Sequence, residues 1–544
     1  MPSSFFLHHF RLGLNEVHID VSNEVDAEAV QLAAEPRRAA PASRGVTRRP
    51  PQLLNAVNPA TRELIAQVFV TAPACIPAIV SRANNAAHPW GDLPFRARAG
   101  AMARLRHLVA HRAHEIAETI ARSMGKPLIE ALSFEVARVL EIIDDCIAQA
   151  ADDVADEPVA ALFTLPALLA RYRSALLPCT PRAVVCVIAP VSLPFEQAMT
   201  PAVLALVAGN AVIVKPSSSA PLVAVLIERL FDEAFADFPG IAQVVFGAGA
   251  LGSLLATSGG VDAVVFAGST SVGRELGAAL ASLQRPAQLD VGGTNPLIVC
   301  DDANLERAAN ATVFGRFSNN GQAWAAINRV YVQRTVADAF LHKVMHKVRA
   351  LKSGPYTDAF CAMGPLANGR GLENLRAVLQ EALDQRAELL NGSFPMHVTG
   401  HDNGERRGAD RQGWFWPPTV ITKVNHSMRV MNEPLFGPIL PIQVCEDDRE
   451  AITLANSTSF AFDASIFSAD LARAQQIAGE LRAGAVAIND VFVHNAVGRL
   501  PSGSAPCLLD DGIDDREPHW FPYSAAKLHA IERAMIVDQD VSVG

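Results

Sequence analysis

The stretch from residue 183 to residue 290 has the most regular alternation of apolar runs and amphipathic segments in the chain. Short β-branched runs, VVCVI at 184–188 and AVIVKP at 211–216, are separated by a helical pattern that reaches Ala208. Continuous apolar strands that alternate with helices are typical of a parallel sheet covered on both faces. The same alternation continues with a helix from about Ala220 to Phe235, a strand at 243–246, a short helix near Leu251 and a strand in VDAVVFAGST (261–270).

Ligands of such sheets bind at the carboxyl ends of the strands. That rule places Pro190–Pro194, Lys215–Ser219 and Gly268–Gly273 along one rim. AGSTSVG (267–273) follows a predicted strand and opens a helix, so its backbone N–H groups suit an anion such as a pyrophosphate, although the same turn is also an ordinary helix N-cap. Lys215 suits a ribose or phosphate oxygen, and its alternative is a surface lysine at a strand end.

A second alternating region starts at residue 290 and predicts a second α/β domain of similar size. Its apolar runs are NPLIVC, RVYVQ, PPTVIT, FGPILPIQVC, DASIFS and AVAIND. Upstream of both regions, apolar residues recur at helical spacing from Arg98 to Met124, which predicts one long helix that ends at Gly125 and Pro127. Three histidines on it, His107, His111 and His114, share a face, and the surrounding arginines favour a solvated polar face over a metal site.

Composition excludes several function classes. The formal net charge is −10 and the 46 basic residues are scattered, so we expect no nucleic-acid partner. Eight cysteines without a CxxC pair argue against a disulfide framework or a zinc ribbon. We find neither an apolar run of signal-peptide length at the start nor a stretch near the ~20 apolar residues of a membrane span, so we expect a cytoplasmic protein without a membrane partner.

Eight motifs, taken together and in order, resemble the aldehyde dehydrogenase superfamily over roughly residues 53–500. The motifs are GKP (125–127), IAPVSLP (188–194), AGNAVIVKPS (208–217), FAGSTSVG (266–273), LDVGGTNP (289–296), FSNNGQAW (317–324), NEPLFGPILP (432–441) and AGAVAIND (483–490).

The resemblance implies a fold with a Rossmann-type, parallel-sheet cofactor domain, a second α/β catalytic domain and a small bridging or oligomerisation element. We expect an N-terminal extension without regular structure at 1–52, which is rich in Pro and Arg, and a dinucleotide-binding domain at 53–288 with a bridging strand near 165–182. A catalytic-type domain at 289–490 and a divergent bridging segment at 491–544 follow. A homodimer or homotetramer is expected, since oligomers are usual in the family.

The family mechanism needs a thiolate that attacks the aldehyde carbon, at the end of the pattern F-x-N-x-G-Q-x-C. Phe317, Asn319, Gly321 and Gln322 match that pattern, and the cysteine position holds Trp324. An indole cannot form the thiohemiacetal. Cys300 ends a strand that the family places beside the site, but the sequence gives no sign that it points there.

Two further chemical positions differ from the family. Asp290 stands where a general-base Glu is usual, which shortens the reach by ~1.5 Å. Ser192 stands where the family has the oxyanion-binding Asn, and losing one good donor typically costs ~10²–10³ in rate.

The implied cofactor is NAD or NADP. Lys215, Gly268, Ser269 and Gly273 are retained, as is Phe436, which the family packs near the nicotinamide. Ser218 replaces the Glu that binds the adenosine ribose in the family, which removes repulsion against a 2′-phosphate and makes NADP at least as plausible as NAD.

The position that holds the nicotinamide ribose is Pro434 instead of Glu, and Glu433 is one residue away. No metal is expected.

Three functional hypotheses remain open at this point. The first is a family member that has lost thiol-dependent oxidation and persists as a nucleotide-binding protein. The second is an active oxidoreductase without a covalent intermediate, in which Asp290 is the base and Ser192 the donor for a small hydrated aldehyde. The third is a non-catalytic subunit of an oligomer.

Overall fold

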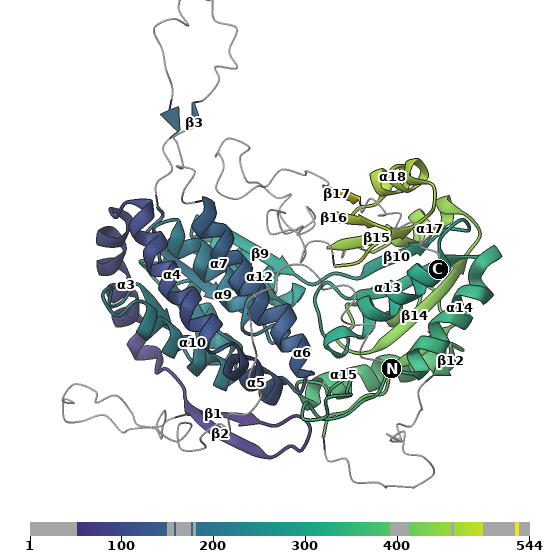
Figure 1. The fold of residues 1–544 in the computed structure, drawn as a ribbon, viewed down its shortest axis with the longest axis horizontal. Coiled ribbons are helices and arrows are strands. Elements are labelled where there is room, and N and C mark those ends of the chain that lie inside the picture. The colour runs from purple at the N-terminus through teal and green to yellow at the C-terminus, as the bar shows by residue number, and fades with distance from the viewer. Residues whose placement is uncertain are drawn as a thin grey trace, which may run out of the picture.

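A computed structural model describes residues 52–149, 181–391, 413–458 and 462–492, together with short strands at 157–158, 176–177 and 528–531. These residues form two lobes, each built around a sheet (Figure 1). The expected extension at 1–52 lies outside the described residues except for Gln52, as do most of the expected bridging strand near 165–182 and most of 491–544.

The first lobe contains a five-stranded sheet in the order β7-β6-β5-β8-β9, and every neighbouring pair is parallel. All residues of its two central predicted strands are buried, because helices cover both faces. The predicted alternation of strands and helices in this region is confirmed. The strands are β5 (Val184–Ile188), β6 (Ala211–Lys215), β7 (Ala242–Val244), β8 (Ala263–Gly268) and β9 (Ala287–Val291).

The predicted single helix over Arg98–Met124 is wrong. Two helices, α4 (Phe95–His111) and α5 (Ala113–Met124), meet at Arg112, whose backbone leaves the helical region with φ −103° and ψ 19°. The apolar spacing continues across the break, which is why the pattern predicted one helix. Gly125 ends α5 in the left-handed conformation with φ 77°, as predicted.

The remaining elements of the first lobe surround that sheet. They are β1 (Leu53–Val57), β2 (Leu64–Phe69), η2 (Pro73–Cys75), α3 (Ile76–Gly91), α6 (Leu128–Glu130), η3 (Ala131–Val136), α7 (Ala137–Gln149), α9 (Glu196–Val207), α10 (Pro221–Ala234), α11 (Gly249–Ala256) and α12 (Thr270–Ser282). A separate antiparallel pair joins β3 (Glu157–Pro158) to β4 (Leu176–Leu177).

The second lobe contains an eight-stranded sheet in the order β12-β13-β14-β11-β10-β15-β16-β17, parallel except for the β12–β13 pair. Every apolar run predicted after residue 290 lies in one of its strands. The strands are β10 (Asn295–Val299), β11 (Ile327–Gln333), β12 (Glu388–Asn391), β13 (Thr419–Thr422), β14 (Ile439–Cys445), β15 (Asp463–Phe467), β16 (Ala485–Ile488) and β17 (Leu528–Ile531). Its helices are α13 (Leu305–Phe317), η4 (Ser318–Gly321), α14 (Arg334–Arg349), α15 (Gly369–Asp384), α16 (Arg429–Asn432), α17 (Asp448–Ala455) and α18 (Leu471–Glu480).

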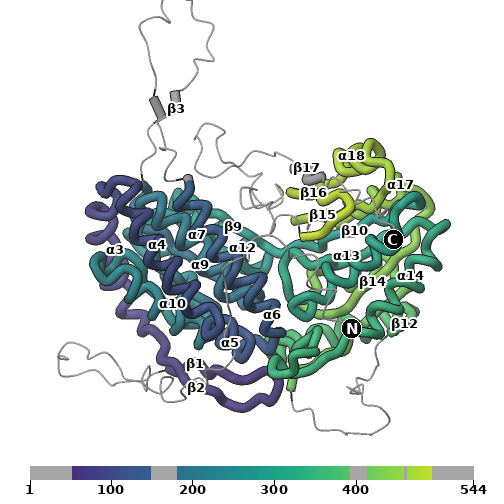
Figure 2. The backbone as a smooth tube through the Cα atoms, in the orientation of Figure 1, coloured from purple at the N-terminus to yellow at the C-terminus, as the bar shows by residue number. Residues whose placement is uncertain are grey.

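The chain crosses from one lobe to the other between Val291, at the end of β9, and Asn295, at the start of β10 (Figure 2). The carboxyl end of the first sheet therefore lies near the amino end of the second. A second contact joins Gly364 to Gly125, where an added Cβ would lie 1.8 Å from the Gly125 oxygen. Only glycine fits at position 364, so the lobes approach each other at backbone distance.

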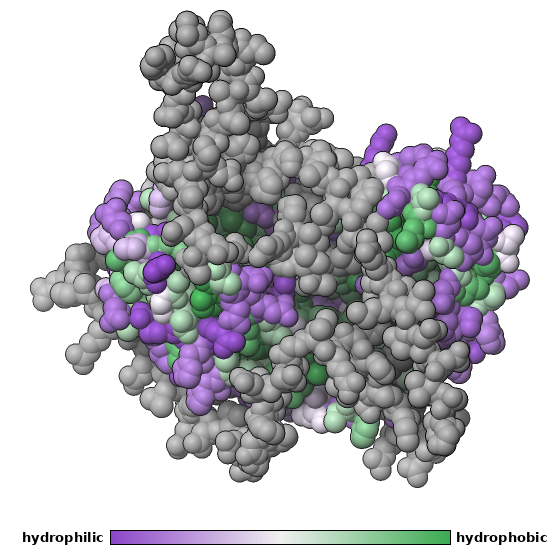
Figure 3. All heavy atoms as spheres, turned by 45° about the horizontal axis from the view of Figure 1, so that its top comes forward, coloured by the Kyte–Doolittle hydropathy of each residue, from purple (hydrophilic) through white to green (hydrophobic). Residues whose placement is uncertain are grey.

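On the face turned to the viewer in Figure 3, hydrophilic residues cover most of the outer edge of the second lobe, with smaller apolar patches between them. No helix in the described part of the chain is both long and apolar enough to cross a membrane.

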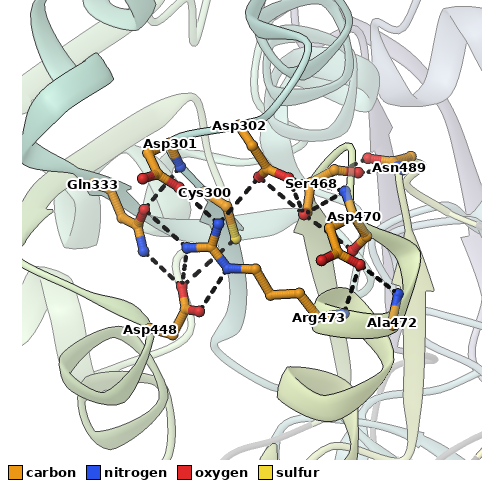
Figure 4. A network of polar contacts seen from close by, with 10 residues as sticks. All are labelled: Cys300, Asp301, Asp302, Gln333, Asp448, Ser468, Asp470, Ala472, Arg473 and Asn489. Atoms are coloured by element: carbon orange, nitrogen blue, oxygen red, sulfur yellow. Dashed lines mark hydrogen bonds and ion pairs between the residues drawn. The ribbon is translucent and has the colours of Figure 1, made fainter.

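Arg473 is the centre of a polar network at the carboxyl end of the second sheet (Figure 4). Its guanidinium donates to both oxygens of Asp448 at 2.7 and 2.8 Å and to Asp301 at 2.7 Å, which holds the pKa of Asp301 below its usual value. Asp302 accepts from the Ser468 hydroxyl at 2.9 Å and lies 3.4 Å from Arg473. This network ties α18 to the ends of β10 and β15 and to the start of α17.

Replacing Arg473 by Met should lower the free energy of unfolding by roughly 1–2 kcal/mol, because partly buried carboxylates lose their shared cation. Chemical denaturation measures the change. Arg334→Met is the matched control, since the Arg334–Glu446 pair is more than 60% exposed on both sides and should contribute little to stability. Equal losses in the two variants would contradict a structural role for the network.

Candidate active site

The polar segment Phe317–Trp324 forms a tight turn at the end of α13. Asn319, Asn320 and Gly321 all adopt the left-handed conformation, with φ of 51°, 55° and 69°. Left-handed residues other than glycine cost of order 1 kcal/mol or more, and Asn tolerates the conformation best. Gly321 has no alternative, because an added Cβ would lie 2.4 Å from the Gly437 oxygen.

Contacts from both lobes hold this turn. The Asn319 N–H donates to both carboxylate oxygens of Glu130, at 3.0 and 3.1 Å, and the Asn319 amide donates to the Ser192 carbonyl at 2.8 Å. Gln322 accepts from the Ala367 N–H at 2.9 Å. Phe317 is buried in the core of the second lobe. The four residues that match the family pattern therefore shape and anchor the turn.

Trp324 packs edge-on against Phe462, with ring centroids 4.0 Å apart and planes at 82°. Trp324 is partly buried. The backbone carbonyl of Trp324 accepts a hydrogen bond from the Asn295 side-chain amide at 3.2 Å. Phe462 is buried and reaches this place because residue 293 is glycine: a Cβ there would lie 2.7 Å from the Phe462 nitrogen. Sequence reasoning did not single out Phe462, since one aromatic residue beside a strand carries no signal of its own.

Ser192 is buried at the start of the segment that leads into α9. Its hydroxyl donates to Gln197 at 3.2 Å, so the proton of the predicted oxyanion donor is already directed at another residue. Its carbonyl accepts from Asn319 and, at 3.2 Å, from the Lys126 ammonium. In this structure Ser192 thus contacts the turn through its backbone.

Asp290 and Phe436 flank the crossing between the lobes. Asp290 lies in β9 and accepts from Gln288 at 3.1 Å. Two residues later, a Cβ at Gly292 would lie 3.2 Å from the Phe436 ring, so this ring covers the backbone just after the Asp290 strand. Phe436 is 39% exposed, which leaves one side of its ring accessible.

Glu433, next to Pro434, forms an ion pair with Arg429. Both of its oxygens accept from Arg429, at 3.0 and 2.9 Å, within α16 and its C-cap. The neighbouring backbone is fixed by Arg316, which is fully buried and donates to the carbonyls of Leu435 and Gly437. Burial lowers the pKa of Arg316 to about 9.

Five of the six predicted cofactor positions lie at the carboxyl end of the first sheet, and the sixth, Phe436, lies in the second lobe. Lys215 ends β6 with its stem against Gly252, and its ammonium donates to the Pro216 carbonyl at 3.1 Å. Burial lowers the pKa of Lys215 to about 8, against a smaller opposing effect of Cys186. Ser218, three residues further on, is partly buried.

The second part of this rim is the start of α12. Gly268 ends β8, and Ser269 is the exposed N-cap residue, whose side chain makes no capping hydrogen bond. A Cβ at Gly273 would lie 2.5 Å from the Val291 side chain, so glycine lets α12 approach β9. First-turn N–H groups that the N-cap side chain does not satisfy, on the same sheet edge as a buried lysine, fit the phosphates and ribose of a dinucleotide.

Cys300 is separate from this site. It follows β10 at the end opposite Asn295, beside Arg473 (Figure 4), and its thiol lies 3.9 Å from an Asp448 oxygen. Burial raises the pKa of Cys300 to about 12, so it stays a thiol. Cys361 is buried as well, lies within hydrogen-bond distance of the Gly354 and Met363 carbonyls, and has a pKa raised by burial to about 11.

The three histidines of the predicted long helix lie on two helices of the first lobe, His107 and His111 on α4 and His114 on α5. The rings of His107 and His111 are nearly parallel, 6.0 Å apart, and both residues are exposed. The described residues contain no cluster of three or more His, Cys, Asp or Glu side chains that could hold a metal ion.

Comparison with known proteins gives one consistent family. The sequence model of the aldehyde dehydrogenase family matches residues 46–503. The chain is 33% identical to a 4,4'-diapolycopene aldehyde oxidase of Methylomonas sp over 87% of its length and 88% of the relative's. It is 31% identical to a probable NADP-dependent succinate-semialdehyde dehydrogenase of Sinorhizobium fredii, over 84% and 87% of the two chains.

Solved structures that resemble this chain include dehydrogenases. A 3,6-anhydro-L-galactose dehydrogenase in complex with NADP superposes with a TM-score of 0.74 at 29% identity, over 81% of this chain and 89% of that one. An indole-3-acetaldehyde dehydrogenase of P. syringae, a cysteine-to-alanine variant with bound NAD⁺ and IAA, superposes with a TM-score of 0.74 at 28% identity, over 81% and 86%.

Removing the ring of Phe462 should release Trp324. Phe462→Ala should cost about 3–4 kcal/mol of unfolding free energy and shift the Trp324 emission to the red, because a large buried side chain is lost and the indole meets water. The Trp324 signal is the difference between spectra with and without Trp324→Phe. Phe360→Ala is the control, since Phe360 is 67% exposed and its removal should change neither quantity. An unshifted spectrum in Phe462→Ala would show that Phe462 does not shield the indole.

Proposed function

Because the chain belongs to the aldehyde dehydrogenase family of NAD(P)-dependent oxidoreductases, we propose that it binds the dinucleotide but has lost thiol-dependent aldehyde oxidation. One observation supports the proposal most: Trp324, which the motif predicts at the nucleophile position, is packed against Phe462. The turn that presents the nucleophile is intact while the nucleophile itself is missing. The first of the three hypotheses from the sequence is therefore the one we adopt.

No described cysteine offers a substitute thiolate at the turn. Cys300 lies at the far end of its strand, and Cys361 is buried with a raised pKa. Oxidation without a covalent intermediate, the second hypothesis, needs a free donor at Ser192, whose hydroxyl is directed at Gln197. At the predicted nucleophile position the ring of Trp324 packs against Phe462, which leaves a bulky apolar pair where this chemistry needs an aldehyde.

The dinucleotide side of the site supports retained binding. Lys215 would donate to a ribose or phosphate oxygen, and the N-terminus of α12 at Ser269 would face the phosphates. A bound NAD(P) supplies the hydride acceptor in this family. Both NADP and NAD⁺ occur in the similar solved structures, and the P. syringae relative has NAD⁺ bound with a cysteine replaced. Ser218, which carries no charge, is compatible with a 2′-phosphate.

The absence of oxidation is tested with an aldehyde panel taken from the relatives: succinate semialdehyde, an aminoaldehyde, betaine aldehyde and a long apolar polyene aldehyde. Reduction of NAD⁺ and NADP⁺ is followed at 340 nm. Wild type should not exceed the blank, and Trp324→Cys alone should stay inactive because Ser192 and Asp290 also differ. The combined variant Trp324→Cys, Ser192→Asn, Asp290→Glu should gain measurable turnover. Wild-type turnover in the ordinary range of ~1–10³ s⁻¹ would refute the proposal.

Retained binding is tested by titration with NAD(H) and NADP(H). Lys215→Met should weaken binding by about tenfold, or ~1.4 kcal/mol. Since the pKa of Lys215 is about 8, its ammonium donates below pH 8 and is lost above it. Wild-type affinity should therefore fall between pH 7 and 9.5, whereas the affinity of Lys215→Met should not change. Lys423→Met, at a 73% exposed lysine, is the control. No binding by wild type would overturn this half of the proposal.

A further inference from the structure

A buried polar cluster lies beneath the turn that carries Trp324. Lys126, Glu130 and Glu135, from the segment after Gly125, are each at most 3% exposed. The Lys126 ammonium lies 2.6 Å from a Glu135 oxygen, and the other Glu135 oxygen accepts from the Phe195 N–H at 2.8 Å. Glu135 is thus paired with Lys126 and the start of α9. A buried charged pair with this many partners is expensive to remove.

Glu130 has a different partner. Its two oxygens share one N–H, that of Asn319, although Glu130 belongs to the first lobe and Asn319 to the second. The Asn319 amide also reaches the first lobe, at the Ser192 carbonyl. Asn319 is the first of three consecutive left-handed residues, so its conformation needs contacts from outside the turn.

We propose that Glu130 is a positioning residue: its carboxylate holds the Phe317–Trp324 turn of the second lobe against the first lobe and thereby sets where residue 324 stands. The inference concerns the same turn as the proposed function but does not require a bound dinucleotide. It assigns to Glu130 a role that acts through Asn319, without contact to a substrate.

The charge on Glu130 should control how firmly the turn is held. Burial raises the pKa of Glu130 to about 7, against the opposing effects of the Asn319 N–H and of Lys126. Lys126, the charged group that acts on Glu130, is itself paired with Glu135, and the Cys361 thiol, which also interacts with Glu130, stays protonated. A carboxylate accepts more strongly than a protonated acid, so the hydrogen bond to Asn319 should strengthen as pH rises through about 7.

The free energy of unfolding should fall as pH rises, although the hydrogen bond between Glu130 and Asn319 strengthens. The pKa of Glu130 is higher in the folded chain than its ordinary value of 4.5, so its contribution to stability is fully present below pH 4.5 and is lost as pH rises through about 7. Glutamine has the same shape as glutamate and does not titrate, so Glu130→Gln should remove the pH dependence of both the hydrogen bond and the stability. Glu130→Gln keeps a carbonyl oxygen for the Asn319 N–H and should therefore fold.

The experiment follows the Trp324 emission, as the difference between chains with and without Trp324→Phe, from pH 5.5 to 8.5 without nucleotide. We expect a titration with a midpoint near 7 in the Glu130 chain, and no titration in Glu130→Gln. The free energy of unfolding should fall with rising pH in wild type relative to Glu130→Gln. Glu141→Gln, at a 63% exposed glutamate, is the control and should titrate like wild type. A midpoint that Glu130→Gln leaves unchanged would refute the proposal.

A second measurement needs no variant at Glu130. Amide hydrogen exchange of the peptide that contains Asn319, corrected for the intrinsic pH dependence, should show about fivefold more protection at pH 8 than at pH 6. Equal protection at the two pH values would refute the proposal even if Glu130→Gln failed to fold. A chain that binds no dinucleotide but shows this titration would refute the proposed function and leave the role of Glu130 standing.

Discussion

The site depends on the backbone of Asn319, whose N–H and side chain both bond to the other lobe. The bonds to Glu130 and Ser192 place a turn of the second lobe at the rim of the first sheet. The same turn brings Gly321 against the Gly437 carbonyl. Arg316 binds that carbonyl as well, and the segment it fixes carries Phe436 over Gly292. One strained turn thus connects the crossing between the lobes with the aromatic ring that covers it.

The two lobes contribute different kinds of group to the site. The rim of the first sheet offers a buried lysine and a helix N-terminus without a side-chain cap, which are groups suited to phosphate and ribose. The facing part of the second lobe offers two aromatic rings in contact, which suit neither an aldehyde oxygen nor an oxyanion. This contrast between polar groups on one side and aromatic rings on the other is the physical basis of our proposal that dinucleotide binding persists without aldehyde oxidation.

The sequence predicted the strands well because buried parallel strands are continuous apolar runs with turn residues at their ends, as in Val184–Ile188 and Ala211–Lys215. The break at Arg112 was missed because the apolar spacing continues across it. The position of Trp324 followed from the motif, but its contact with Phe462 did not, since the two residues are far apart in the chain. Glu130 was missed for the same reason: a lone carboxylate near a helix start is an ordinary surface residue until the fold buries it.

The residues that match the family pattern hold the turn although residue 324 is Trp, and their burial gives a structural reason for keeping them. Truncating Glu130 would leave the Asn319 N–H without its acceptor in a water-free place, and a buried unsatisfied donor costs about 1–3 kcal/mol. Truncating Asn319 would likewise cost the Ser192 carbonyl one of its two donors. Trp324 differs, because its ring packs against Phe462, a residue of the same lobe. The nucleophile position can therefore change without loosening the contact between the lobes, whereas the residues that hold the turn cannot.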